Sequence, residues 1–104
     1  MMQNLEMMVD IETFSQRVNA APASIGAVIF DIEKLEIVDR FYVNIDIKSS
    51  KEYGLHISKD TLDWWAKRPK EVFQSLLKDP QSLPDALDMC SEFFRKSGNI
   101  VWAP

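Results

Sequence analysis

The feature that most constrains the fold is a nine-residue stretch near the N-terminus, residues 5–13, which reads Leu-Glu-Met-Met-Val-Asp-Ile-Glu-Thr. Side chains alternate across a β-strand, so one face of this stretch is predicted to be apolar and buried: Leu5, Met7, Val9 and Ile11. Asp10 and Glu12 fall on the other face, with Cα atoms roughly 6.6 Å apart. Two carboxylates at that separation repel each other and lose hydration on burial unless a cation lies between them. The pair therefore predicts a site for a hard divalent cation, which prefers carboxylate oxygens.

The same alternation permits a second interpretation of the acid pair. The stretch could form a strand at the edge of a sheet, where Asp10 and Glu12 simply face water. The apolar residues Met7, Val9 and Ile11 suit either arrangement. The pattern by itself leaves metal binding and plain solvent exposure open.

Length and composition predict one domain in a reducing compartment. The 104 residues are 46% hydrophobic, enough for one domain with one core. The single cysteine, Cys90, excludes an internal disulfide and suits the cytoplasm, which is the expected location. No run of 18 apolar residues is present and the N-terminus lacks a signal-peptide pattern, so no membrane partner is expected.

The charge is distributed unevenly along the chain, whose net charge is −4. Residues 1–47 hold eight acids and three bases, whereas residues 48–70 hold six bases and three acids. An acidic metal pocket beside a mildly basic lobe would suit a nuclease. A solvated helical surface explains the same charges, and charge alone favours that explanation.

Hydrophobic periodicity predicts a mixed α/β domain. Three strands are expected at residues 5–12, 23–30 and 36–43, close enough in sequence to form an antiparallel meander. A polar connection is expected over residues 44–57. Three helices follow at residues 58–67, 69–78 and 83–97, with Ser58 and Ser82 as expected N-caps of the first and third. A short fourth strand at 99–102 is expected to pair parallel with the first.

Four sequence motifs, in this order, resemble one known family. Asp-Ile-Glu-Thr at residues 10–13 is followed by Ser-Ile-Gly-Ala-Val-Ile-Phe-Asp at 24–31, by Thr-Leu-Asp-Trp-Trp at 61–65 and by Ile-Val-Trp-Ala at 100–103. The chain resembles the DEDD 3′-5′ exonucleases, the DnaQ-like and ribonuclease T-like branch of the ribonuclease H fold. Within that branch it is most similar to the phage exodeoxyribonuclease and exonuclease VIII-like subgroup. The resemblance covers the N-terminal half of the family's catalytic domain and implies a ribonuclease H-like mixed sheet.

The resemblance implies a site and a chemistry. Asp10 and Glu12 would be catalytic residues that ligate a pair of Mg²⁺ or Mn²⁺ ions, and the substrate would be the 3′ end of DNA or RNA, hydrolysed by a two-metal mechanism. Thr13 and Phe14 would contact the terminal nucleotide. The alternative for these two residues is a strand cap and a core phenylalanine.

The adjacent tryptophans are expected to have different environments, because neighbouring side chains on a helix point about 100° apart. Trp65 is expected to pack inward. Trp64 could stack on an unpaired base, although core packing or a partner interface would also explain it. Arg68 stands where the subgroup usually carries Gln, and a phosphate contact remains open to it. His56 is expected to be a surface or loop-packing residue.

The resemblance also implies four acids, of which this chain carries the first two. The 104-residue chain is therefore expected to be inactive or nearly so, as the N-terminal part of a single exonuclease domain. The alternatives are a non-catalytic prophage-type remnant or oligomerising binding module with the same fold, or another ribonuclease H-fold enzyme that shares only the acidic strand. A homodimer through the exposed edge of the fourth strand is a further hypothesis.

Overall fold

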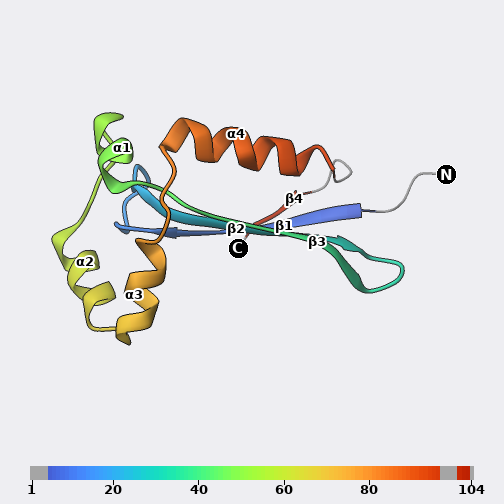
Figure 1. Cartoon of the computed structure of the whole chain (residues 1–104), viewed down its shortest axis with the longest axis horizontal. Coiled ribbons are helices and arrows are strands. Elements are labelled where there is room, and N and C mark those ends of the chain that lie inside the picture. The colour runs from blue at the N-terminus through green and yellow to red at the C-terminus, as the bar shows by residue number, and fades with distance from the viewer. Residues whose placement is uncertain (1–4, 97–100, 104) are drawn as a thin grey trace.

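The computed structural model describes residues 5–96 and 101–103, which form four strands and four helices. The strands are β1 (Leu5–Thr13), β2 (Pro22–Asp31), β3 (Glu36–Asn44) and β4 (Val101–Trp102). They form one sheet in the order β3-β2-β1-β4, in which β1, β2 and β3 are antiparallel and β4 runs parallel to β1 (Figure 1). The predicted mixed sheet is confirmed. Residues 99 and 100 of the expected fourth strand lie outside the described residues.

The helices are α1 (Ile47–Glu52), α2 (Lys59–Ala66), α3 (Lys70–Leu76) and α4 (Leu83–Phe94). The predicted caps are confirmed, because Ser58 Oγ accepts the Thr61 N–H and Ser82 Oγ accepts the Asp85 N–H. The described part of the chain contains no helix with the length and apolar character needed to cross a membrane.

Helix α1 corrects the prediction of a polar connection over residues 44–57. The residues that α1 buries are Ser49 and Ser50 rather than an apolar stripe. Hydrophobic periodicity is the main signal of a helix in a sequence, and a helix that buries two serines lacks it.

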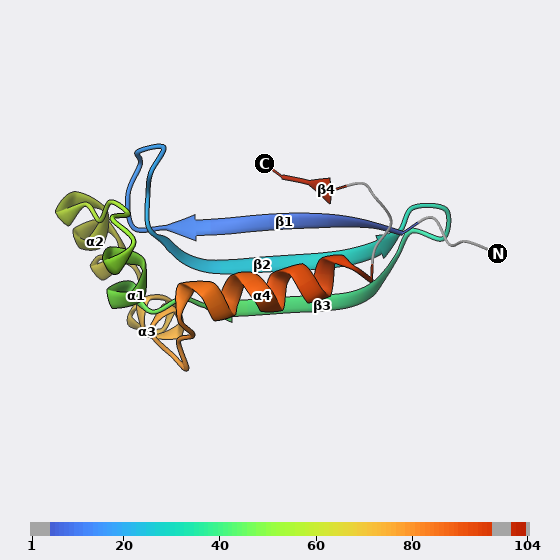
Figure 2. The ribbon, with the colours of Figure 1, turned by 90° about the horizontal axis from the view of Figure 1, so that it is seen from above.

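One face of the sheet is covered by α4, which lies over β2 and β3 (Figures 1 and 2). Ile25 and Val43 pack against Leu83 and Ala86 of the helix, and the Phe93 ring stacks on Phe41 with 5.3 Å between centroids. Strand β1 lies farther from the helix, so its cover is incomplete (Figure 2). Met7 is buried at 2% exposure, but Ile11 is 51% exposed, and the prediction that Ile11 is buried was therefore wrong.

A second core lies at one end of the sheet, where α2 and α3 pack beside the strand ends (Figure 1). Its buried members are Phe14, Ala23, Trp65 and Leu76. Asn44, buried at the end of β3, ties α3 to the sheet because its amide nitrogen donates to the carbonyl oxygens of Ser75 and Lys78 at 2.6 and 2.8 Å. The strand ends and the three short helices therefore form one packed unit.

Two irregularities interrupt the strand register. Glu12 pairs with Ser24 and Thr13 with Pro22, which leaves Ala23 as an extra residue on β2. A second shift leaves Val38 extra on β3. Bulges of this kind bend a strand and redirect its side chains, and they are frequent beside active sites. The first one directly follows the acid pair and brings Ala23 into the core with Phe14.

Candidate functional site

The two acids of the first strand lie on the face of the sheet opposite α4. Asp10 and Glu12 are both exposed and alternate with Ile11, so they share a face as the pattern predicts. Asp10 pairs with Gly26, which in turn pairs with Tyr42. Met8 stands on the same face, 48% exposed and beside Asp10 in a shallow surface hollow.

Gly26 lies beside Asp10 on this face, and the space around it is open enough for a side chain. A methyl group at this position would lie 3.7 Å from Tyr42 Cδ2 and 4.0 Å from the Asp10 carbonyl oxygen. These are ordinary van der Waals separations. The absence of a side chain at Gly26 leaves open surface beside Asp10.

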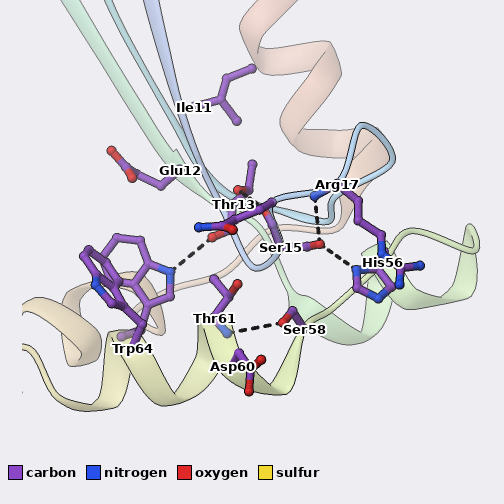
Figure 3. Close-up of a pocket in the computed structure, with 12 residues that line it drawn as sticks. Ile11, Glu12, Thr13, Ser15, Arg17, His56, Ser58, Asp60, Thr61 and Trp64 are labelled. Atoms are coloured by element: carbon purple, nitrogen blue, oxygen red, sulfur yellow. Dashed lines mark hydrogen bonds between the residues drawn. The ribbon is translucent and has the colours of Figure 1, made fainter.

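The end of β1 is held to α2 by a short series of hydrogen bonds. The Trp65 indole Nε1–H donates to the Thr13 carbonyl at 3.1 Å, and the Ser58 N–H donates to the Phe14 carbonyl at 2.8 Å. The Thr13 hydroxyl donates to the Ser15 carbonyl at 2.6 Å. Residues 13–15 are therefore fixed relative to the helix that carries the two tryptophans (Figure 3).

A pocket of about 550 Å³ opens beside this junction. Its lining includes Glu12, Thr13, Arg17, His56, Asp60 and Trp64. Glu12 extends to the same side of the strand as Trp64, whereas Ile11 points away (Figure 3). Asp10 is not among the lining residues and lies in the separate surface hollow beside Met8, so only Glu12 of the acid pair lines the pocket.

Sequence reasoning missed the polar pair that lies deeper in this pocket. Ser15, 3% exposed, has its hydroxyl 2.5 Å from His56 Nδ1 and also accepts the Arg17 N–H at 3.2 Å. His56 is a loop-packing residue, as expected, because its backbone bonds to Asn19 and Ala21. No sequence signal could have paired Ser15 with His56, since 41 residues separate them and neither stands in a motif.

The two tryptophans divide as predicted. Trp65 is buried at 8% exposure, and Trp64 is 50% exposed and lines the pocket. Their rings meet edge to face with 4.9 Å between centroids. The Arg68 guanidinium lies 4.4 Å from the centroid of the Trp64 ring, so it is engaged in a cation–π contact and does not line the pocket.

The side chain of Phe14 is 1% exposed and belongs to the core of the α2–α3 end. The structure therefore places this ring where it cannot reach a substrate, in agreement with the alternative of a core phenylalanine. Thr13, by contrast, lines the pocket directly after Glu12.

The acid pair suits a divalent metal in the kind of donor it offers. Asp10 and Glu12 present carboxylate oxygens, the preferred ligands of Mg²⁺ and Mn²⁺, on one exposed face. Within residues 5–96 and 101–103, however, no group of three or more acidic, histidine or cysteine side chains converges on such a position. A metal bound by Asp10 and Glu12 would therefore need further ligands, and these would not be acidic, histidine or cysteine side chains of the described residues.

Three solved structures share this fold. They are the nuclease domain of 3′hExo, a DEDDh family member bound to rAMP (TM-score 0.63), cell-death related nuclease 4 (0.57) and a 3′-exonuclease described in 3′-end specific recognition of a histone mRNA stem-loop (0.56). Each is 12% identical to this chain. The matches cover 97%, 90% and 90% of this chain but 52%, 31% and 40% of the other, so the chain spans about half of the first structure's length and less of the other two.

No curated protein matches the chain. A protein-family model matches the chain over residues 5–104, which is nearly the whole sequence. The matched range includes both acids and the two adjacent tryptophans. That model describes the 3′-5′ exoribonuclease Rv2179c-like domain. The strand order agrees with the fold that the solved structures share with this chain. The chain belongs to the 3′-5′ exoribonuclease Rv2179c-like domain family.

Proposed function

We propose that this chain is the N-terminal part of a 3′-5′ exonuclease domain that hydrolyses phosphodiester bonds with two divalent metal ions, Mg²⁺ or Mn²⁺. The observation that carries the proposal is the pair of exposed carboxylates, Asp10 and Glu12, on one face of β1 beside a pocket. In such a site, bound metal supplies a nucleophilic water at neutral pH and stabilises charge on the departing oxygen. The matched exoribonuclease family and the rAMP-bound relative support RNA as the first substrate to test.

The residues around the pocket have distinct roles in this proposal. Thr13 positions the terminal nucleotide, because its backbone is fixed to Trp65. Trp64 offers a half-exposed ring on which an unpaired base stacks, worth about 1–3 kcal/mol per base. The Arg68 guanidinium covers one face of the Trp64 ring. In this proposal, the guanidinium contacts a phosphate only after its side chain has moved off that ring.

The chain by itself is proposed to be inactive or nearly so. Affinity for a hard cation rises with the number and charge of its ligands, and no group of three or more acidic, histidine or cysteine side chains comes together within the described residues. The competing proposal, a non-catalytic remnant with the same fold, differs in one respect: it requires no acid-dependent metal binding. The phage exonuclease VIII-like subgroup stays a prediction, as does a homodimer through the edge of β4.

Calorimetric titration with Mn²⁺ separates these proposals. We expect weak binding by the unaltered chain that is abolished by Asp10→Asn or Glu12→Gln, since each removes one carboxylate charge from the pair. Glu36→Gln, an exposed acid at the start of β3, is the matched control and is expected to bind as the unaltered chain does.

Equal binding by all three variants would assign the acids to plain solvent exposure and support the remnant. The activity test uses labelled single-stranded RNA and DNA with Mn²⁺. Processive 3′ trimming by the 104-residue chain would contradict the proposal that it is inactive.

A further inference from the structure

A second groove, of about 660 Å³, lies between α1 and the start of α2. Apolar side chains that belong to the two cores form its floor: Ile47, Leu55, Ile57 and Leu62. Three lysines line it as well, Lys48 and Lys51 from α1 and Lys59 from α2. The groove thus joins an apolar floor with three cationic groups.

The groove carries positive charge without compensation. No acidic residue lines it, and none of the three lysines takes part in an ion pair within the described parts of the chain. Glu52 belongs to α1 but does not line the groove. The fold therefore divides the basic segment 48–70: half of its cations gather here, while Lys67, Arg68 and Lys70 stand at the far end of α2.

The lysine-bearing face of α1 has a fixed position. Ser49, which lies between Lys48 and Lys51 in the sequence, is buried. Its hydroxyl oxygen accepts the N–H of Leu83 at the start of α4, at 2.8 Å. Because Lys48 and Lys51 are three residues apart on a helix, they project from the same side. Burial of the serines on the opposite side keeps both lysines directed outward.

The groove lies beside the candidate pocket. His56 lines both, and at the start of α2 Lys59 lines the groove while Asp60 and Thr61 line the pocket. A strand that leaves the pocket past His56 therefore reaches a cavity lined by three lysines. Phosphate groups repeat along a nucleic-acid strand, so such a strand is complementary to this path.

We propose that the groove of Lys48, Lys51 and Lys59 binds the phosphate backbone of a single-stranded nucleic acid upstream of the 3′ end held in the pocket. This inference rests on the proposed exonuclease function and adds the path of the substrate. The apolar floor contacts the faces of unpaired bases, which a duplex would not present to it. Sequence-independent binding of single strands uses a positively charged groove that follows the backbone together with side chains that contact the base faces; these are commonly aromatic, whereas here they are aliphatic.

The test measures fluorescence anisotropy of labelled RNA, in EDTA to prevent hydrolysis, over a range of salt concentrations. The probes are a trinucleotide and a strand of about 12 nucleotides, within the usual site size for single strands. The groove variant is K48Q/K51Q/K59Q. The matched control is K34Q/K70Q/K78Q, which removes the same charge from three exposed lysines outside the groove.

For the longer strand, we expect the groove variant to lower the slope of log affinity against log salt by about two, which is the effect of losing three phosphate contacts. If the two proteins bind the strand equally at about 1 M salt, the groove variant is then expected to bind it roughly 100-fold more weakly than the unaltered chain at about 0.1 M salt. The control variant retains most of the slope. Trinucleotide binding is expected to be the same in both variants, because so short a probe does not reach the groove.

Equal losses in the groove and control variants would overturn the inference, as would failure of the unaltered chain to bind the longer strand at low salt. Tighter, lysine-dependent binding of labelled polyglutamate than of RNA would instead assign the groove to an acidic protein segment. Thermal unfolding of both variants checks that they are folded. Mn²⁺ titration distinguishes failure of this inference from failure of the proposed exonuclease function. If only the inference about the groove is wrong, Mn²⁺ binding still depends on Asp10 and Glu12 and is unchanged in both lysine variants.

Discussion

At the scale of single residues, burial separates a structural acid from the two candidate ligands. Glu6, Asp10 and Glu12 follow the same alternation on β1. Glu6 is only 6% exposed, and its carboxylate accepts the Trp102 indole N–H at 2.7 Å, which ties β4 to β1. Asp10 and Glu12 are exposed, and within the described residues their carboxylates accept no such hydrogen bond. Three acids on one face of the same strand thus have two different environments.

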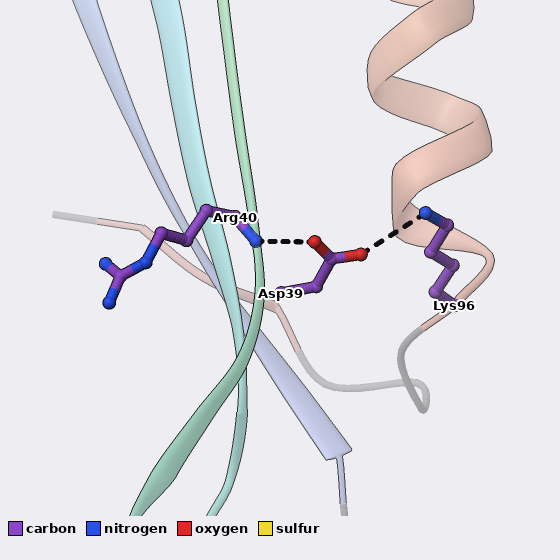
Figure 4. Close-up of polar contacts among 3 residues, drawn as sticks. All are labelled: Asp39, Arg40 and Lys96. Carbon is purple, nitrogen blue, oxygen red and sulfur yellow. Dashed lines mark hydrogen bonds and ion pairs between the residues drawn. The ribbon is translucent and has the colours of Figure 1, made fainter.

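Asp39 on β3 provides a prediction about pH (Figure 4). The Arg40 backbone N–H, at 2.8 Å, and the Lys96 ammonium, at 3.3 Å, lower the pKa of this carboxyl below its ordinary value. A carboxyl with a lowered folded-state pKa contributes stability when ionised, and that stability is lost as the pH falls through the folded-state pKa. We expect Asp39→Asn to be less stable than the unaltered chain at neutral pH, with the difference decreasing once the pH falls below the ordinary carboxyl value of 3.8 and vanishing only below the lowered folded-state pKa.

Urea unfolding of both proteins at a series of pH values measures this difference. Lys96→Gln is expected to weaken the pH dependence, because it removes one of the two groups that stabilise the charged form. Lys34→Gln, an exposed lysine of the β2–β3 turn, is the matched control. Parallel stability curves for the unaltered chain and Asp39→Asn throughout the acid range would contradict the prediction.

At the scale of elements, α1 connects the two packed regions of the molecule. Its Ser49 hydroxyl accepts the N–H of Leu83, the first residue of α4, which has no partner within its own helix. Ser50 is fully buried, and its hydroxyl oxygen has no hydrogen-bond partner within the described residues. The two adjacent serines thus contribute differently.

Ser49→Ala is expected to reduce the free energy of unfolding by about 1–3 kcal/mol, because a buried N–H loses its acceptor. Ser50→Ala, the matched variant, is expected to change it by much less or to increase it, since no hydrogen bond is lost. Urea denaturation of both variants gives the comparison. A larger loss for Ser50→Ala than for Ser49→Ala would show that the hydroxyl of Ser50 has a partner.

At the scale of the whole molecule, the sheet has an unpaired edge at β4 within the described residues. Val101 and Trp102 are 42% and 51% exposed there. Exposed apolar edge strands favour pairing with a second chain, and a lysine on the edge opposes it.

The proposed homodimer gives a prediction at this scale. We expect a dimer in analytical ultracentrifugation at high protein concentration, and a shift to monomer in Val101→Lys. Val72→Lys on α3, where the valine is 39% exposed, makes the same change away from the sheet and is expected to leave the dimer intact. A monomeric mass for the unaltered chain at every concentration would exclude association through this edge.

Much of the fold was predictable because its signals are local. The alternation in residues 5–13 located β1, and the serine caps located the starts of α2 and α4. The role of Trp65 also followed from helix geometry alone, since adjacent side chains cannot share one face. Helix α1 escaped prediction because its buried residues are serines, which give no hydrophobic period.

The sequence by itself determined the positions of the strands and of α2, α3 and α4, the shared face of Asp10 and Glu12 and the family resemblance, because all of these depend on residues that are neighbours in the chain. Only the tertiary structure decided that Ile11 is exposed, that Ser15 meets His56 and that three of the six bases of residues 48–70 line one groove. These features arise from packing between distant segments: α4 covers β2 and β3 rather than the end of β1, and α1 folds against α4 through Ser49. Such contacts leave no pattern in the local sequence.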